Sequence, residues 1–115
     1  FAMWKILQQK KPDDYVIATG IQYSIKEFIN ITAKKLNLKI TWKGKGVKEK
    51  AYDSKNFPII ECDTNYFRPL DVNTLLGDAR KAKKKLNWKP LYNLNSLIDE
   101  MIENEFMILN ENHKK

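Results

Sequence analysis

The clearest hydrophobic pattern lies over residues 24–36, where apolar side chains recur at the spacing of one helix face. Ser24 and Glu27 can form a capping box, in which each side chain binds the backbone N–H of the other residue. Asn37 suits the left-handed conformation that commonly ends a helix. The pattern predicts an amphipathic helix whose stripe packs in the core. Its positions are Ile25, Phe28, Ile29, Thr32 and Leu36.

Helical spacing also appears near both ends of the chain. Residues 1–10 resemble the end of an incomplete helix, with Met3, Ile6 and Leu7 on one face and no capping residue before it. Asp78 is a suitable N-cap for a helix over 79–86. Asn93 can cap a last helix, and a frayed tail is expected over 111–115.

The inward positions of these two C-terminal helices follow from the same spacing. In the helix over 79–86 they are Ala79, Ala82 and Leu86. In the last helix they are Leu94, Leu97, Ile98, Met101, Ile102, Phe106 and Leu109.

Three shorter segments have the composition of strands. Residues 15–18 are β-branched and aromatic, which predicts a buried strand closed by Thr19 and Gly20. Residues 38–43 alternate between apolar and polar, as a half-exposed strand does. Residues 57–62 resume a strand in which Pro58 is the first residue or lies at an edge. The lysine-rich segment 47–56 is expected to be a loop. The sequence thus predicts an α/β fold with three or four short strands.

Composition leaves two interpretations of the charge open. The 115 residues include 21 lysines and arginines against 14 acidic residues, giving a net charge of +7. Such an excess can indicate an anionic partner such as nucleic acid or a phosphorylated small molecule, or merely a solvated lysine-rich surface. Only Arg68 and Arg80 are arginines, whereas base-reading proteins usually rely on arginine.

The same composition argues against several other classes of protein. No apolar run approaches the roughly 20 residues that cross a bilayer. Cys62 is the single cysteine, so no internal disulfide forms and a cytoplasmic location is expected. Cys62 is either a small, half-buried strand residue or a reactive thiol. His113 is the single histidine and lies in the tail, so neither a metal site nor a Ser/His/Asp system is expected.

The most distinctive stretch is Tyr66-Phe67-Arg68-Pro69-Leu70-Asp71. Arginine presents a planar fork of donors that suits phosphate, and a carboxylate can accept hydrogen bonds from the two hydroxyls of a ribose. With an aromatic side chain beside them, Arg68 and Asp71 have the parts of a nucleotide-diphosphate site. A surface salt bridge between the two residues is the alternative interpretation.

Several motifs in order and spacing resemble GDP-mannose 4,6-dehydratases of the extended short-chain dehydrogenase/reductase family. They are Tyr15-Val16-Ile17-Ala18-Thr19-Gly20, Ser24-Ile25-Lys26-Glu27-Phe28, Tyr66-Phe67-Arg68-Pro69, Leu75-Leu76-Gly77-Asp78 and Leu86-Asn87-Trp88-Lys89-Pro90. The resemblance covers residues 1–110. The family usually has glutamate where Asp71 stands and histidine where Tyr23 stands.

This resemblance implies that residues 1–110 form a C-terminal sugar-nucleotide-binding domain, with the Rossmann half missing. Such an enzyme converts GDP-mannose to GDP-4-dehydro-6-deoxy-D-mannose with NADP, on the way to GDP-fucose. The resemblance implies that the NADP site and the catalytic residues lie upstream, so the chain alone is expected to be inactive. By the same motifs, Arg68 would contact the diphosphate or ribose of GDP, and Asp71 would accept from a ribose hydroxyl.

Three interpretations therefore compete. The first is a fragment of a GDP-mannose 4,6-dehydratase, which is expected to be a homo-oligomer when intact and to bind neither nucleic acid nor membrane. The second is part of a related sugar-nucleotide epimerase or dehydratase. The third is a basic nucleic-acid-binding module. If a Rossmann half normally covers this domain, the chain should expose apolar surface.

Overall fold

The structure, a computed structural model, describes residues 1–66, 68 and 74–112. Three short strands form an antiparallel sheet in the order β1-β2-β3, and the chain also forms four α-helices within the described residues. The predicted α/β class is therefore confirmed. In chain order the elements are α1 (Ala2–Leu7), α2 (Ile25–Lys35), β1 (Thr41–Lys43), the 3-10 turn η1 (Gly46–Lys48), β2 (Lys50–Tyr52), β3 (Pro58–Glu61), the 3-10 turn η2 (Thr64–Tyr66), α3 (Arg80–Leu86) and α4 (Leu94–Asn112).

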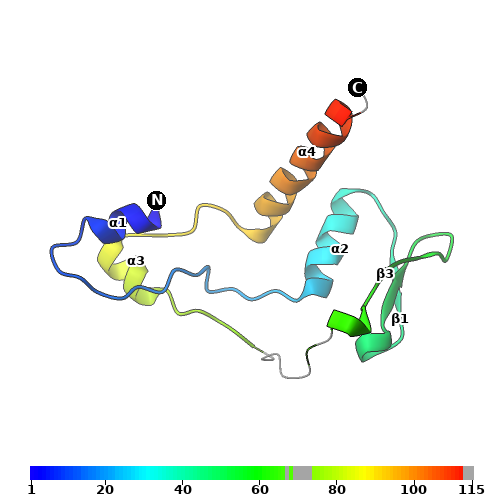
Figure 1. Cartoon of the computed structure of the whole chain (residues 1–115), viewed down its shortest axis with the longest axis horizontal. Helices are drawn as coiled ribbons and strands as arrows, with labels where there is room; N and C mark the ends of the chain where they lie inside the picture. The colour runs from blue at the N-terminus through cyan, green and yellow to red at the C-terminus, as the bar shows by residue number, and fades with distance from the viewer. Residues whose placement is uncertain (67, 69–73, 113–115) are drawn as a thin grey trace.

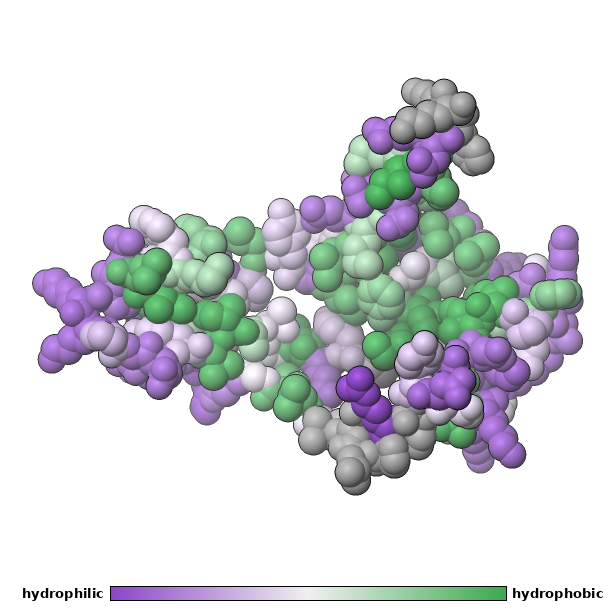
Figure 2. Space-filling model, in the orientation of Figure 1, coloured by the Kyte–Doolittle hydropathy of each residue, from purple (hydrophilic) through white to green (hydrophobic). Residues whose placement is uncertain are grey.

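The elements gather at two ends of an elongated molecule. Figure 1 shows α1 and α3 together at one end, and α2, α4 and the sheet at the other. The radius of gyration is 19.1 Å, whereas a compact domain of this length would have about 13 Å. Hydrophobic residues accordingly form separate green areas at the two ends in Figure 2. The chain therefore builds two small packed units instead of one core.

Helix α2 is capped as predicted, but its predicted core stripe is only partly confirmed. Ile25 is exposed, Phe28, Ile29, Thr32 and Leu36 are half-buried, and the buried residue of the helix is Ala33. The Ser24 hydroxyl accepts from the Glu27 backbone N–H at 3.1 Å, and the Glu27 carboxylate accepts from the Ser24 N–H at 2.7 Å. These two bonds are the predicted capping box. Asn37 adopts a φ of 56°, as expected for the residue that ends the helix.

Helix α3 starts one residue later than predicted. Its N-cap is Ala79, because the Asp78 carboxylate accepts from the Arg80 N–H and not from a residue further into the helix. The predicted inward positions are nevertheless confirmed, since Ala79, Ala82 and Leu86 are all buried.

Helix α4 is capped as predicted but differs at its end and in its burial. Asn93 Oδ1 accepts from the Ser96 N–H, and Ser96 Oγ accepts from the Asn93 N–H. The helix continues to Asn112, so residues 111 and 112 belong to it and not to a frayed tail. Residues 113–115, with His113, lie outside the described residues. Of the predicted stripe only Ile98 is buried.

Helix α1 ends at Leu7, earlier than the predicted residue 10, and is fastened to α3 by one side chain. The Lys5 ammonium donates to the carbonyl oxygens of Leu86 and Asn87 at 3.0 and 2.8 Å. These are carbonyls that the end of α3 leaves without helical partners. Met3 and Leu7, two of the three residues on the predicted apolar face, are exposed.

The sheet contains a strand that the sequence did not indicate. Strand β2 lies within the segment predicted to be a loop, and it pairs with both β1 and β3. Its central residue, Ala51, is fully buried. A strand of only three residues, Lys50–Tyr52, is too short for an alternating pattern to be recognised in the sequence. Strand β1 covers only the second half of the predicted 38–43, and Pro58 is the first residue of an edge strand, as predicted.

The prediction of a strand over residues 15–18 is wrong for the described chain. Tyr15–Ala18 has no regular secondary structure, and no backbone–backbone hydrogen bond joins it to another described segment. Val16 and Ile17 are exposed. A strand needs a neighbour to receive its N–H and C=O groups, however strong its β-propensity. The segment has the composition of a strand but no partner among the described residues.

The expected exposure of apolar surface is confirmed. Large hydrophobic side chains are exposed on α1, α4, the 15–21 segment and the loop around Leu75. Within the described residues, no helix has both the length and the apolar character that crossing a membrane requires.

Candidate functional site

The segment that carries Arg68 leaves the edge strand β3 through the turn η2. Asp63 organises this turn: its carboxylate accepts from the Asn65 N–H at 2.8 Å, and its carbonyl accepts from the Tyr66 N–H at 3.1 Å. Tyr66 is 82% exposed, and Arg68 is exposed as well. The structure thus places an aromatic side chain and a guanidinium in solvent, two residues apart, where a ligand could reach both.

Asp71 is the second residue of the predicted nucleotide-diphosphate site. Asp71, with Phe67 and Pro69, lies outside the described residues. Whether Asp71 approaches a ligand beside Arg68, or forms the alternative salt bridge with it, stays a prediction. Cys62, by contrast, is described: it is exposed and lies beyond the end of β3, so the prediction of a half-buried strand residue is wrong.

The chain after this segment returns to the other unit and packs against residues 16–18. A β-carbon placed on Gly77 would come within 2.6 Å of the Ala18 β-carbon and 3.3 Å of Val16 Cγ1. Only glycine allows the two extended segments to lie this close. The packing explains the glycine in the Leu75-Leu76-Gly77-Asp78 motif, whose structural role the sequence alone did not reveal.

Beside this contact the surface is hollowed over about 370 Å³, between Gly20 and the start of α3. Arg80 and Lys83 contribute cations, but the Asp78 carboxylate accepts from Arg80 Nε at 2.8 Å and from Nη2 at 2.6 Å. The Arg80 side chain is the main reason that the pKa of Asp78 falls from 3.8 to about 2. Because Asp78 balances the charge of Arg80, we assign no ligand to this hollow. Its lining residues are Gly20, Leu76, Gly77, Asp78, Ala79, Arg80 and Lys83.

The four lysines of α3 are exposed, yet two of them are paired. Asp13, from the segment after α1, accepts from Lys81 at 2.5 Å and from Lys85 at 3.1 Å. These two bonds are the main reason that the pKa of Asp13 falls from 3.8 to about 2. With Arg80 held by Asp78, three of the five cations of α3 already have a carboxylate partner, which weakens the case for a nucleic-acid surface here.

In the described part of the chain, no three histidine, cysteine or carboxylate side chains lie close enough together to hold a metal ion. The described residues of the candidate site are an exposed arginine, Arg68, and an exposed aromatic residue two positions before it, Tyr66, both after the end of the edge strand β3.

Comparison with known proteins defines the class to which this scaffold belongs. The family model described as GDP-mannose 4,6 dehydratase matches residues 1–101. The chain belongs to this family.

Individual relatives agree with the family model. GDP-mannose 4,6 dehydratase 2 of Caenorhabditis elegans is 39% identical over 94% of this chain, and GDP-mannose 4,6-dehydratase of Vibrio cholerae is 40% identical over 91%. The human GDP-mannose 4,6 dehydratase is 37% identical over 96% of the chain. The matches span only 28%, 31% and 30% of those three proteins, respectively.

Proposed function

We propose that the chain is the C-terminal, substrate-binding part of a GDP-mannose 4,6-dehydratase of the extended short-chain dehydrogenase/reductase family. The complete enzyme would convert GDP-mannose to GDP-4-dehydro-6-deoxy-D-mannose. It would use NADP held by a Rossmann domain upstream, where the catalytic residues would also lie. The observation that carries this proposal is the family match over residues 1–101, together with relatives that are about three times as long.

Within this function, Arg68 and Asp71 would hold the GDP end of the substrate. The exposed guanidinium of Arg68 can donate two parallel hydrogen bonds to a phosphate, which is the strongest arrangement available to an arginine. The Asp71 carboxylate would accept from a ribose hydroxyl. The exposed ring of Tyr66, two residues before Arg68, would pack against a sugar or base.

The unpaired segment Tyr15–Ala18 supports the proposal of an upstream Rossmann domain. Its residues favour a strand, its backbone groups lack partners among the described residues, and Val16 and Ile17 are exposed. An added sheet would supply hydrogen bonds to this backbone and cover both side chains. The proposal also includes a cytoplasmic homo-oligomer that binds neither nucleic acid nor membrane. The carboxylates that hold three α3 cations support the absence of a nucleic-acid partner.

A chimeric enzyme tests the function directly. In it, this chain replaces the matching segment of the Vibrio cholerae relative, and dehydratase activity and GDP binding are measured. We expect an active chimera whose Arg68→Ala variant binds GDP about 10 to 100 times more weakly, because hydrogen bonds to charged groups contribute about 1.5–3 kcal/mol. Lys34→Ala, which removes an exposed cation on α2, is the matched control.

Asp71 is tested in the same chimera. Asp71→Ala should weaken GDP binding, whereas Asp71→Glu, which restores the residue usual in the family, should retain it. An inactive but folded chimera would argue for the related epimerase or dehydratase. Unchanged GDP binding by the Arg68→Ala variant would remove Arg68 from the site. The chain by itself, given NADP and GDP-mannose, should form no product.

A further inference from the structure

Asp63 holds the turn η2 with both its side chain and its backbone. Its carboxylate accepts from the Asn65 N–H at 2.8 Å, and its carbonyl accepts from the Tyr66 N–H at 3.1 Å. Aspartate often forms a turn in this way, because its short side chain reaches the backbone N–H two residues further on. All residues from Asp63 to Tyr66 are exposed. Hydrogen bonds, and not the burial of side chains, therefore hold this turn.

The sheet fixes the position from which the turn starts. Two residues before Asp63, Glu61 pairs with Lys50 of β2, and Lys50 Nζ lies 2.5 Å from Glu61 Oε2. The next pair along the two strands contains Ala51, which is fully buried. The backbone that enters η2 is thus attached to the buried centre of the sheet.

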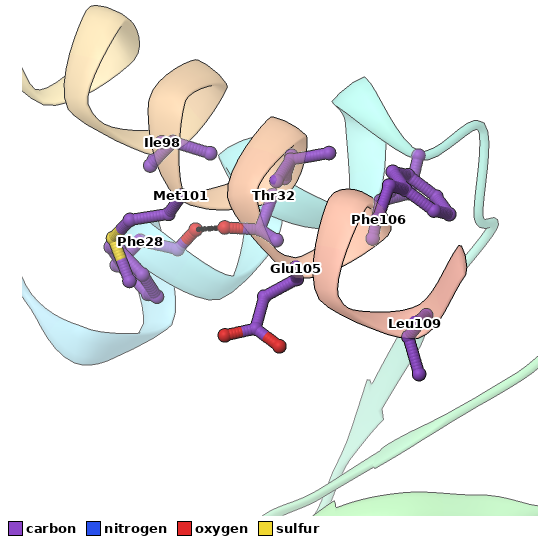
Figure 3. Close-up of a pocket in the computed structure, with 9 residues that line it drawn as sticks. Phe28, Thr32, Ile98, Met101, Glu105, Phe106 and Leu109 are labelled. Carbon is purple, nitrogen blue, oxygen red and sulfur yellow. Dashed lines mark hydrogen bonds between the residues drawn. The ribbon is translucent and has the colours of Figure 1, made fainter. Parts of the chain in front are cut away.

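The helices support the sheet in turn. The indole N–H of Trp42 in β1 donates to Asn30 Oδ1 of α2 at 2.8 Å. Helix α2 lies beside α4, and Figure 3 shows Phe28 of α2 and Met101 of α4 at the groove between these two helices. Contacts therefore connect α4, α2 and the sheet, and η2 extends from the edge strand of this unit.

Arg68 follows the turn by two residues, and the sequence restricts its backbone from the other side as well. Pro69 comes next, and a proline disfavours the helical conformation at the residue before it. A side chain that is already directed toward its ligand loses less conformational entropy on binding. The turn before Arg68 and the proline after it thus both limit the directions that the guanidinium can take.

The charge of Asp63 argues against direct contact with a phosphate. A carboxylate repels a diphosphate, and Asp63 Oδ1 is already used by the Asn65 N–H. We propose that Asp63 is a positioning residue of the GDP site: by holding η2, it presents Tyr66 and Arg68 to the same nucleotide diphosphate. This inference rests on the proposed function, in which Arg68 binds GDP.

Four substitutions of Asp63 in the chimeric enzyme separate its hydrogen bond from its charge. Asp63→Ala and Asp63→Glu lose the short acceptor, so fewer molecules have η2 formed, and the KM for GDP-mannose should rise about three- to tenfold. The kcat should stay nearly unchanged, because the GDP end of the substrate does not react. Asp63→Asn and Asp63→Ser keep an acceptor without the charge, and their KM should be no higher than about twice that of the starting chimera.

These variants test the proposal even if one of them fails to fold, because Asp63→Glu repeats the comparison made with Asp63→Ala. If Asp63→Asn were as weak as Asp63→Ala, or Asp63→Glu as good as the starting chimera, the charge and not the turn would matter. Either result would overturn the proposal.

Asp53 provides a matched control, because it forms the same kind of turn at the opposite end of β2 and β3. Its carboxylate accepts from the N–H groups of Lys55 and Phe57 at 2.9 and 2.7 Å, and its carbonyl accepts from the Asn56 N–H at 3.1 Å. Asp53→Ala should lower the unfolding temperature but leave the KM for GDP-mannose unchanged. An equal rise in KM for Asp53→Ala and Asp63→Ala would reduce the role of Asp63 to general stability.

A double substitution shows whether Asp63 acts through Arg68. Asp63→Ala should weaken GDP binding less in the Arg68→Ala chimera than in the starting chimera, whereas equal effects in both would overturn the proposal. If Arg68→Ala weakens GDP binding but Asp63→Ala does not, this inference alone is wrong. If neither substitution weakens binding, the proposed role of Arg68 is wrong as well.

Discussion

Gly77 lies so close to Ala18 that any side chain at Gly77 would overlap the Ala18 β-carbon, at a distance of 2.6 Å. This contact joins residues 16–18 to the segment before α3, and both belong to motifs by which the family is recognised. Because no positive φ is required at Gly77, the contact itself, and not the backbone conformation, demands glycine.

We expect Gly77→Ala to lower the free energy of unfolding by about 1–3 kcal/mol, the usual cost of overpacking. Ala18→Gly in the same chain should recover part of this loss, because it removes the atom that the new methyl group meets. Denaturation followed by circular dichroism measures both effects. Leu75→Ala, at an exposed position, is the control. Additive effects of the two substitutions would show that the residues do not touch.

Asp13 should make the stability of the folded chain depend on pH in the acid range. Its pKa is about 2 when Lys81 and Lys85 surround it and 3.8 ordinarily. A carboxyl whose pKa is lowered by folding stabilises the folded chain above its ordinary pKa, and this contribution is lost as the pH falls through about 4 to 2. We therefore expect Asp13→Asn to reduce stability at pH 7 and to leave it nearly unchanged at pH 2.

Thermal unfolding at the two pH values measures this difference, and Asp14→Asn is the control at the neighbouring exposed position. Since Asp13 and both lysines are on the surface, the loss at pH 7 should shrink when salt is added. An equal loss at both pH values would show that the ion pairs with Lys81 and Lys85 do not account for the effect.

The capping box of α2 gives a second prediction about stability. Ser24→Ala removes the acceptor of the Glu27 N–H and should cost about 0.5–2 kcal/mol. Ser24→Thr keeps the hydroxyl and should cost less. Chemical denaturation measures both variants. If alanine and threonine behaved alike, the capping bonds would not contribute to the stability of the helix.

Lys5 should determine whether α1 stays on α3. Lys5→Met keeps much of the length of the side chain but cannot donate to the carbonyls of Leu86 and Asn87. We expect the backbone amides of α1 to exchange with deuterium about tenfold faster, because a hydrogen bond from a charged group is lost. Lys10→Met, outside α1 and exposed, is the control. Unchanged exchange would mean that other contacts hold the helix.

The helices could be predicted from the sequence because their signals are local. Ser24 with Glu27, and Asn93 with Ser96, bind each other within one turn, and both pairs cap their helices in the structure. The sheet was harder because strands depend on partners. Strand β2 forms because β1 and β3 pair with it on both sides, whereas Tyr15–Ala18 has better strand residues but no hydrogen-bonded strand beside it in the described chain.

In the candidate site, too, local features could be predicted from the sequence and contacts between segments could not. Residue type singled out Arg68, and the structure places it in solvent after η2. Other contacts near the site join separate segments or fix the direction of a side chain. They are the close approach of Gly77 to Ala18, the ion pair of Arg80 with Asp78 and the ion pairs of Asp13 with two lysines. Such contacts have no signature in a single sequence.

The bond between Lys5 and Leu86 spans 81 residues, and it has a consequence for synthesis on the ribosome. Helix α1 is made before α3, so the carbonyl that holds Lys5 is not available until 81 further residues have been made. At about 5–20 residues per second, the wait is roughly 4 to 16 s. Throughout that time Lys5 has no carbonyl partner on α3, so helix α1 should stay unanchored, and its backbone open to proteolysis, until residue 86 has emerged.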